Sequence, residues 1–241
     1  MIQIVKKLLL VLLVGTSLNA ATLLSQNEVK KIEELELFKR AQISVKKAYD
    51  VEDFYLLKVV IQGNSDELYL TKDKKNLIAG EIINTQTGAK LEVPADVSGL
   101  AGKEALTFGS GSDEYFLFTD PECPYCKKFE SYFPQIEKNV KIRVFFYPLD
   151  FHKNAKDMSM YIMSKKTNAE KIKAMLSINI NDEDYKNRNY SKKELAELET
   201  SLTAQIAIAQ ELEVRGTPAV FDKEGNKVSW PNMLTKYKVK Q

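Results

Sequence analysis

The residues best suited to chemistry are Cys123 and Cys126, the only two cysteines in the 241-residue sequence. A Pro-Tyr dipeptide separates them, a strand-like run at 115–119 precedes them, and a helix-like run at 127–132 follows. A thiol at the start of a helix faces unpaired backbone N–H groups and the positive end of the helix dipole, which favour the thiolate. The spacing therefore predicts that Cys123 is a nucleophile and that Cys126, one turn later, resolves the mixed disulfide.

Three other interpretations of the cysteine pair are weaker. A structural zinc site needs four ligands, usually Cys or His, and the chain adds only His152 to the two cysteines. A purely structural disulfide would close a very short loop and stabilise the fold little. Two inert core thiols fit poorly beside Pro, Glu, Tyr and Lys. We therefore expect redox chemistry, with no metal and no cofactor other than the Cys123–Cys126 dithiol or disulfide.

The first twenty residues have the pattern of a secretory signal peptide. Lys6 and Lys7 precede an apolar core at 8–14, and Leu18-Asn19-Ala20 offers a small residue at the expected cleavage point. The apolar run is far shorter than the ~20 residues that span a bilayer, although retention as an uncleaved anchor is the alternative. No cysteine directly follows the run, which argues against a lipoprotein anchor. Export would bring the thiols into an oxidising compartment.

Charge balance excludes some functions. Without residues 1–20, basic and acidic residues are equal at 33 each, so the expected net charge is close to zero. A neutral chain is a poor candidate for binding nucleic acid or a membrane surface electrostatically. Stretches rich in Lys and Glu, such as 30–39, are better interpreted as solvated helix faces.

The elements before the cysteines predict a separate α+β domain over 21–93. Residues 28–39 have apolar side chains at near-helical spacing. Strand-like runs follow at 53–61, 67–71 and 77–83. One helix packed on such a small sheet is a plausible stable unit. Residues 94–112 are rich in glycine and are predicted to form a linker.

The elements over 113–241 would position the cysteines directly. A second strand is predicted at 141–147, helices at 155–166 and 194–214, and a polar loop at 179–193. Thr217-Pro218 then leads into a strand, a turn at 222–226 and a final strand at 227–230. This order of strand, CxxC helix, strand, inserted helices and hairpin describes an α/β thioredoxin fold.

Two distant motifs resemble the DsbC/DsbG family of periplasmic thiol:disulfide isomerases. Residues 118–127, Phe-Thr-Asp-Pro-Glu-Cys-Pro-Tyr-Cys-Lys, are similar to its active site, and 214–220, Val-Arg-Gly-Thr-Pro-Ala-Val, to its cis-proline loop. Segments 66–73 and 76–80 resemble strands of its N-terminal domain. The resemblance implies an α+β, cystatin-like dimerisation domain followed by a thioredoxin-fold catalytic domain with a helical insertion, exported to the periplasm.

The resemblance also implies roles for single residues. Cys123 would be the exposed nucleophile and Cys126 the resolving thiol. Four residues would contact an extended substrate segment: Pro124, Tyr125, Thr217 and Pro218. The implied partners are unfolded or misoxidised exported proteins, a DsbD-type electron donor in the inner membrane, and a second copy of the chain bound through 21–93.

The chain departs from the family pattern at several positions. A buried carboxylate occupies the position of Leu117 in thioredoxin and DsbA-type proteins, so proton transfer to Cys126 cannot use that group here. Glu122 is expected either to oppose the neighbouring thiolate slightly or to be a solvated loop acid. The Pro-Tyr dipeptide matches the DsbG version of the motif. His152 follows a different strand, and we expect it on the surface or in packing.

Four functions stay open at this level. The first is isomerisation or reduction of non-native disulfides through Cys123. The second is DsbG-like reduction of single cysteines oxidised to sulfenic acid, which uses the same two thiols. An oxidase would be a monomer held oxidised, and the N-terminal domain argues against it. A holdase chaperone would bind unfolded chains with incidental thiols.

Overall fold

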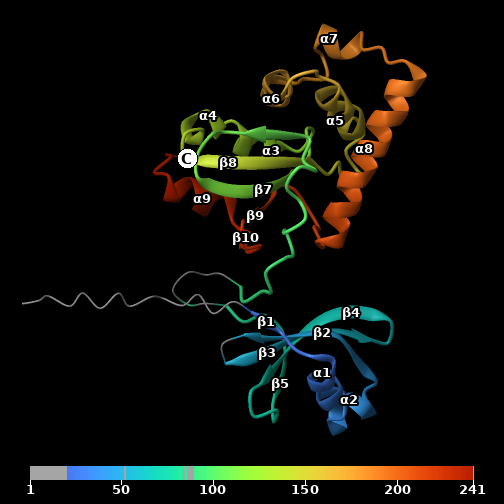
Figure 1. The fold of residues 1–241 in the computed structure, drawn as a ribbon, viewed down its shortest axis with the longest axis vertical. Coiled ribbons are helices and arrows are strands. Elements are labelled where there is room, and N and C mark those ends of the chain that lie inside the picture. The colour runs from blue at the N-terminus through green and yellow to red at the C-terminus, as the bar shows by residue number, and fades with distance from the viewer. Residues whose placement is uncertain (1–20, 52, 84, 86–89, 241) are drawn as a thin grey trace, which may run out of the picture. The chain divides into compact units, whose positions relative to one another are not determined.

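The computed structural model describes residues 21–51, 53–83, 85 and 90–240, so the predicted signal peptide lies outside the described residues. The chain divides into two compact units between Val93 and Pro94. The predicted N-terminal domain ends at the same residue. Each unit has its own hydrophobic clusters and is described separately below (Figure 1).

The first unit is a fully antiparallel sheet with two short helices, and the strands are ordered β1-β2-β3-β4-β5. Its elements are β1 (Thr22–Leu23), α1 (Gln26–Glu33), α2 (Glu36–Arg40), β2 (Ile43–Val51), β3 (Phe54–Ile61), β4 (Asn64–Thr71) and β5 (Leu77–Ala79). Ser25 and Glu28 form a capping box that starts α1. Val29, Ile32 and Phe38 are buried in one cluster with residues of the sheet.

Sequence and structure differ in two places in this unit. The predicted helix at 28–39 is two helices, because the chain leaves helical geometry at Leu35 (φ −59°, ψ 138°) before α2 begins. Strand β2 was not predicted. Its register with β3 shifts between Val45 and Lys47, and this irregularity interrupts the two-residue alternation by which a strand is recognised.

The second unit is built on a mixed sheet in the order β10-β9-β7-β8-β6. Strands β7 and β8 are parallel, and the other pairs are antiparallel. The elements are β6 (Leu106–Phe108), β7 (Asp113–Thr119), α3 (Pro124–Glu130), α4 (Phe133–Ile136), β8 (Val140–Phe146), α5 (Ala155–Met163), α6 (Asn168–Ser177), α7 (Glu183–Lys186), α8 (Lys192–Glu211), β9 (Ala219–Asp222), β10 (Lys227–Val228) and α9 (Trp230–Lys236).

The prediction of a linker over 94–112 is wrong. Val97 and Leu100 are buried against side chains of β7 and β8, and β6 pairs with β8 at the sheet edge. Gly109 and Gly111 allow close approach of two backbones here, because a Cβ on Gly111 would lie 1.9 Å from the backbone carbon of Asn139 and one on Gly109 would lie 2.2 Å from the backbone oxygen of Val140. Glycine is used where two backbones must nearly touch as well as where a chain is flexible. The composition could not distinguish these two uses.

The helices between β8 and β9 form the insertion that the sequence predicted, and Figure 1 shows α5, α6, α7 and α8 grouped beside the sheet. Helix α6 was not predicted, although Thr167 and Glu170 form a capping box at its start. The predicted loop at 179–193 contains the short helix α7. The predicted final strand at 227–230 ends early, because Trp230 begins α9 and packs on Phe129 of α3.

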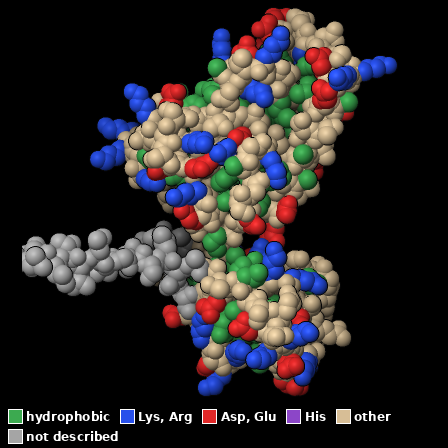
Figure 2. All heavy atoms as spheres, in the orientation of Figure 1, with side chains coloured by type: hydrophobic (Ala, Val, Ile, Leu, Met, Phe, Trp, Pro, Cys, Tyr) green, Lys and Arg blue, Asp and Glu red, His purple; other side chains and the backbone are tan. Residues whose placement is uncertain are grey.

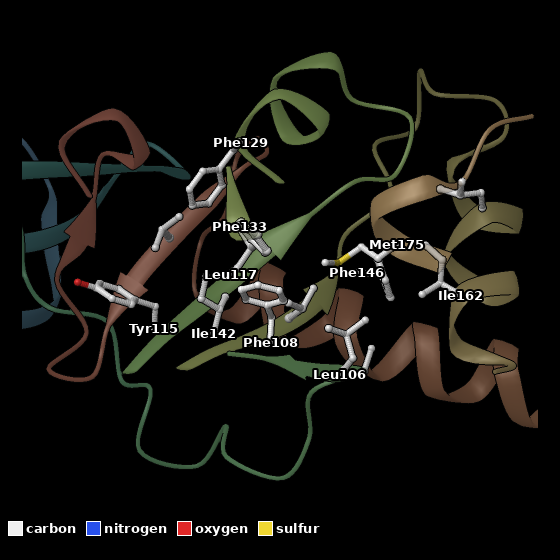
Figure 3. Close-up of a cluster of buried hydrophobic side chains, with 14 of the residues drawn as sticks. Leu106, Phe108, Tyr115, Leu117, Phe129, Phe133, Ile142, Phe146, Ile162 and Met175 are labelled. Carbon is white, nitrogen blue, oxygen red and sulfur yellow. The ribbon is translucent and has the colours of Figure 1, made fainter. Parts of the chain in front are cut away.

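Strand β7, which leads to the cysteines, is buried on both faces. Tyr115 and Leu117 belong to the cluster of Figure 3, which also holds Phe129 and Phe133 of the following helices. Phe116 and Phe118, which alternate with them, belong to a second cluster. A strand buried on both faces is the best-anchored position in such a sheet. The residues directly after it are therefore held in place.

Two further observations concern the charged side chains on the surface and the length of the helices. On the face drawn in Figure 2, basic and acidic side chains are interspersed over both units. Among the described residues, every helix is too short or too polar to cross a membrane.

Candidate active site

Cys123 is the N-cap residue of α3, with extended backbone (φ −71°, ψ 122°), and Pro124 occupies the first helical turn. Proline suits this position because its fixed φ is helical and the helix needs no N–H there. Asp120 shapes the approach: its backbone oxygen accepts from Cys123 N at 3.1 Å, and its carboxylate accepts from Glu122 N at 2.7 Å. The cysteines are thus fixed by a turn between a buried strand and a helix. Both are free thiols rather than members of a disulfide.

The expectation that Cys123 is exposed is wrong for this structure, since only 5% of the residue is accessible. Its Sγ donates to the backbone oxygen of Thr217 at 3.6 Å, so the loop at 216–218 forms part of its cover. Cys126 is fully buried. Tyr125 between them is 68% exposed, and Pro124 is exposed as well, so these two residues are the part of the motif that meets solvent.

The Thr217–Pro218 peptide bond is cis, as the resemblance implied. It directly precedes β9, and β9 pairs with β7 so that Ala219 lies opposite Phe118. This pairing brings the loop to the end of β7 where the cysteines follow, although 94 positions separate Cys123 from Thr217 in the chain. The predicted residues Cys123, Cys126, Thr217 and Pro218 are therefore gathered at one place.

Burial dominates the electrostatics of Cys126. Loss of solvent raises the pKa of this thiol well above its usual range. The hydroxyls of Thr119 and Thr217 and the backbone of Asp120 act in the opposite direction, and the nearby carboxyl of Glu130 raises the pKa further. A thiol in this state is a poor nucleophile until its proton is removed.

Glu130 is a functional candidate that the sequence analysis missed. It lies on α3 four residues after Cys126, is 2% exposed, and its Oε1 accepts from Thr119 Oγ1 at 2.6 Å. Its Oε2 is buried without a hydrogen-bond partner. Burial raises the pKa of Glu130 to about 7, against the lowering effects of Thr119 and Lys127. The four-residue spacing, which puts both side chains on one helix face, was the signal that could have found it.

Lys127, three residues before Glu130 on α3, is the cation whose charge acts on this acid. Its Nζ donates to the backbone oxygen of Ile178 at 2.9 Å, in the loop after α6. Burial lowers the pKa of Lys127, and the carboxylates of Glu130 and Asp182 oppose that change.

A second polar network joins the active-site loop to the segment after β8. The buried Asp120 accepts from Leu149 N and contacts His152 Nδ1, each at 2.8 Å. Glu122 accepts from Asn154 N at 2.7 Å and from its side-chain amide at 2.9 Å. Burial raises the pKa of Glu122, but these hydrogen bonds prevail and hold it below its ordinary value. His152, expected on the surface or in packing, thus contacts the buried carboxylate of Asp120, and Glu122 is a bound rather than a freely solvated acid.

Two further observations complete the site. Phe151, next to His152, is 75% exposed and was not singled out in the sequence. Within the described parts of the chain, no three His, Cys, Asp or Glu side chains cluster in a way that could hold a metal ion.

Comparison with known proteins agrees with this geometry. The family model of the thioredoxin-like domain matches residues 109–240. The chain is 30% identical over 139 residues to the probable thiol:disulfide interchange protein DsbC of Bordetella pertussis, and equally to that of Bordetella parapertussis. Each match covers 57% of this chain and 43% of the relative, so the chain spans less than half the length of these curated relatives. The resemblance to DsbC that the motifs predicted is thereby confirmed.

Solved structures with similar folds include the catalytic domain of Proteus mirabilis ScsC, with a TM-score of 0.44 and 18% identity over 58% of this chain and 90% of that chain. Helicobacter pylori DsbG has a TM-score of 0.40 and 13% identity over 82% of this chain and 100% of that chain.

Proposed function

Because the chain belongs to the thioredoxin-like domain family, we propose that it is a thiol:disulfide oxidoreductase that isomerises or reduces non-native disulfides in exported proteins. The observation that carries this proposal is the placement of Cys123. Its sulfur lies at the start of α3 and against the backbone of the cis Thr217–Pro218 loop, where an extended substrate would pair.

The reaction follows from the two thiols. The Cys123 thiolate attacks one sulfur of a substrate disulfide, and the other substrate sulfur leaves as a thiolate. In isomerisation, a different substrate thiolate attacks the substrate sulfur of the mixed disulfide, which forms a new substrate disulfide and releases Cys123 as a thiolate. In reduction, Cys126 attacks Cys123 and forms the Cys123–Cys126 disulfide, so two electrons pass to the substrate. An external dithiol donor must then reduce that disulfide.

The surroundings of the thiols support a protein substrate. Because Cys123 is covered, a substrate sulfur must enter beside Thr217. Tyr125, between the two cysteines, and Phe151, whose ring contacts His152, are exposed aromatic residues, and aromatic rings contribute strongly to contacts with unfolded chains. Pro124 and Pro218 border the same two thiols. We assign these residues, with Thr217, to substrate contact.

The partners and location belong to the same proposal. Action on exported proteins implies the periplasm, and the signal-like pattern of residues 1–20 supports export. The reduced state would be maintained by a DsbD-type inner-membrane donor. Residues 21–93 would join two chains into a homodimer, since this unit has a core of its own and contains neither of the proposed thiols.

Replacement of Cys123 by Ser tests the reaction. The substitution keeps the size of the side chain and removes the nucleophile, so refolding of a scrambled multi-disulfide substrate should lose its catalysis. Cys126→Ser should still form mixed disulfides but not release a reduced substrate. Full activity of the Cys123→Ser protein would overturn the proposal and favour a holdase whose thiols are incidental.

A second candidate is reduction of single cysteines oxidised to sulfenic acid, which the Pro124-Tyr125 dipeptide favours through its DsbG-like form. The sulfenic acid would be attacked by Cys123 with loss of water, and Cys126 would then release the substrate thiol. A substrate with one sulfenylated cysteine and no disulfide distinguishes the two activities. Alkylation of the thiols in cells separates both from an oxidase, which would be found mainly oxidised.

A further inference from the structure

The resolving thiol has an acid beside it that the proposed reaction has not yet used. Cys126 must lose a proton before it can attack the mixed disulfide, and it is fully buried away from solvent bases. The position at which related folds carry a carboxylate is Leu117, which is buried in the hydrophobic cluster of Figure 3. The proton therefore needs another acceptor.

We propose that Glu130 takes up and returns the proton of Cys126 through the hydroxyl of Thr119. This inference rests on the proposed dithiol function and assigns a new role within it. Thr119 ends β7 and donates to Glu130 Oε1 at 2.6 Å, and its oxygen also neighbours the Cys126 thiol. The Thr119 hydroxyl thus neighbours both the thiol and the carboxylate and can pass a proton from one to the other.

The proton balance closes over one cycle. The Cys126 proton moves to Thr119 Oγ1 as the Thr119 hydroxyl proton moves to Glu130 Oε1. The Cys126 thiolate then attacks Cys123 Sγ, the bond from Cys123 to the substrate sulfur breaks, and the substrate thiolate takes a proton from water. When a dithiol donor attacks Cys123, Cys126 leaves as a thiolate and recovers its proton from Glu130 by the same route.

The charges around Glu130 suit an acceptor that works near neutral pH. Lys127 on the same helix favours the carboxylate, whereas Asp120 from the loop after β7 favours the protonated form. Asp182 acts on Lys127 from the neighbouring loop. Burial prevails over these influences and raises the pKa of Glu130 to about 7, which is where a group can both accept and release a proton.

The test separates two steps in the full-length protein. An aromatic disulfide that releases a coloured thiolate reacts first with Cys123 and then loses its second half when Cys126 attacks. The Glu130→Gln protein should keep the first phase and slow the second by about 10²-fold at pH 8. The wild-type second phase should also fall below about pH 7, where Glu130 becomes protonated. The variant should lack that inflection.

An electrostatic role alone predicts the opposite sign. The Glu130 carboxylate raises the pKa of Cys126, so its loss without any relay would make the thiolate easier to form and the second phase faster. A second phase that is unchanged or faster in Glu130→Gln would overturn the relay. A wild-type protein without a first phase would contradict the proposed function, and the relay with it. The first phase therefore distinguishes failure of the proposed function from failure of the relay alone.

Two further variants guard against a merely structural effect. Thr119→Val preserves the shape of the side chain but removes the bridging hydroxyl, so it should slow the second phase as Glu130→Gln does. Thr119→Ser restores the hydroxyl and should restore the rate. Glu137→Gln makes the same chemical change at an exposed acid of this unit and should leave both phases as in wild type. Equal rates in Thr119→Val and Thr119→Ser would contradict the relay.

Discussion

At the scale of single residues, the site combines an accessible aromatic ring with thiols that are nearly closed off. Tyr125 is exposed, whereas Cys123 is covered by the loop at 216–218 and Cys126 is inside. The sulfur of Cys123 is thus accessible only to a partner that replaces part of that cover. The buried interior around Cys126 also contains Thr119 and Glu130, and burial perturbs the pKa of both ionisable groups.

Glu130 should make stability depend on pH. Its carboxyl is protonated in both folded and unfolded chains below about pH 4.5, its ordinary pKa. As pH rises from there to about 7, the unfolded chain releases the proton first, so the folded state loses stability. The loss is complete above the folded pKa and amounts to about 3 kcal/mol. The Gln side chain in Glu130→Gln carries no charge, so that variant should not lose stability over this pH range.

Trp230 offers the measurement, since it is the single tryptophan and packs on Phe129 of α3. Urea unfolding followed by its fluorescence should give Glu130→Gln an advantage over wild type at pH 8 that disappears at about pH 4. An advantage of equal size at both pH values would contradict the assigned pKa. Glu137→Gln is the matched control at an exposed site and should follow wild type.

At the scale of elements, backbone contacts hold β6 and the start of β7 against β8. Gly111 N donates to Val140 O at 2.9 Å, and Asp113 N donates to Asn139 O at 3.2 Å. These bonds place the glycine-rich segment directly on another strand. Since β7 leads straight to Cys123, the segment helps to position the site.

Gly111→Ala should therefore destabilise the second unit. The added Cβ would lie within 2.2 Å of three backbone atoms of residues 139 and 140, which cannot move aside as a side chain could. We expect a loss of about 1–3 kcal/mol, the usual range for overpacking. Gly99→Ala is the control, because its Cβ would meet only the Lys103 ammonium at 3.8 Å. Urea unfolding of both variants by Trp230 fluorescence tests this, and equal stability would contradict it.

At the scale of the whole molecule, the two units have separate cores and separate tasks in the proposal. The first contains Val29, Ile32 and Phe38 packed on its own sheet. The second contains both thiols and the loop at 216–218. The unit boundary at Val93 and Pro94, rather than the end of the predicted linker, is the point at which to separate them.

Truncation tests both the boundary and the proposed dimer. A fragment of 94–241 should fold, keep its dithiol reactivity, sediment as a monomer and lose isomerase activity. A fragment of 113–241 lacks β6 and the buried Val97 and Leu100, so it should unfold at lower temperature in circular dichroism. Equal melting temperatures would contradict the boundary, and sedimentation of the full chain as a monomer at micromolar concentration would contradict the dimer.

The sequence by itself determined the local features of this protein. The CxxC pair between a strand and a helix, the inserted helices α5 and α8 and the Thr-Pro pair were predicted, because each depends on neighbouring residues or on regular periodicity. Strand β2, helix α6 and the N-terminal part of the second unit were missed or misassigned. The signal of β2 was interrupted by a shifted register, and the N-terminal part of the second unit has a composition shared with linkers.

Only the tertiary structure decided how the site is closed and charged. Pairing of β9 with β7 brings Thr217 over Cys123, and packing of α3 on the sheet removes Cys126 and Glu130 from water. Burial and contact across 94 positions are properties of the folded chain, because desolvation depends on everything that surrounds a group. The sequence could therefore predict two thiols with redox chemistry, whereas the acid beside the second thiol became visible only in the fold.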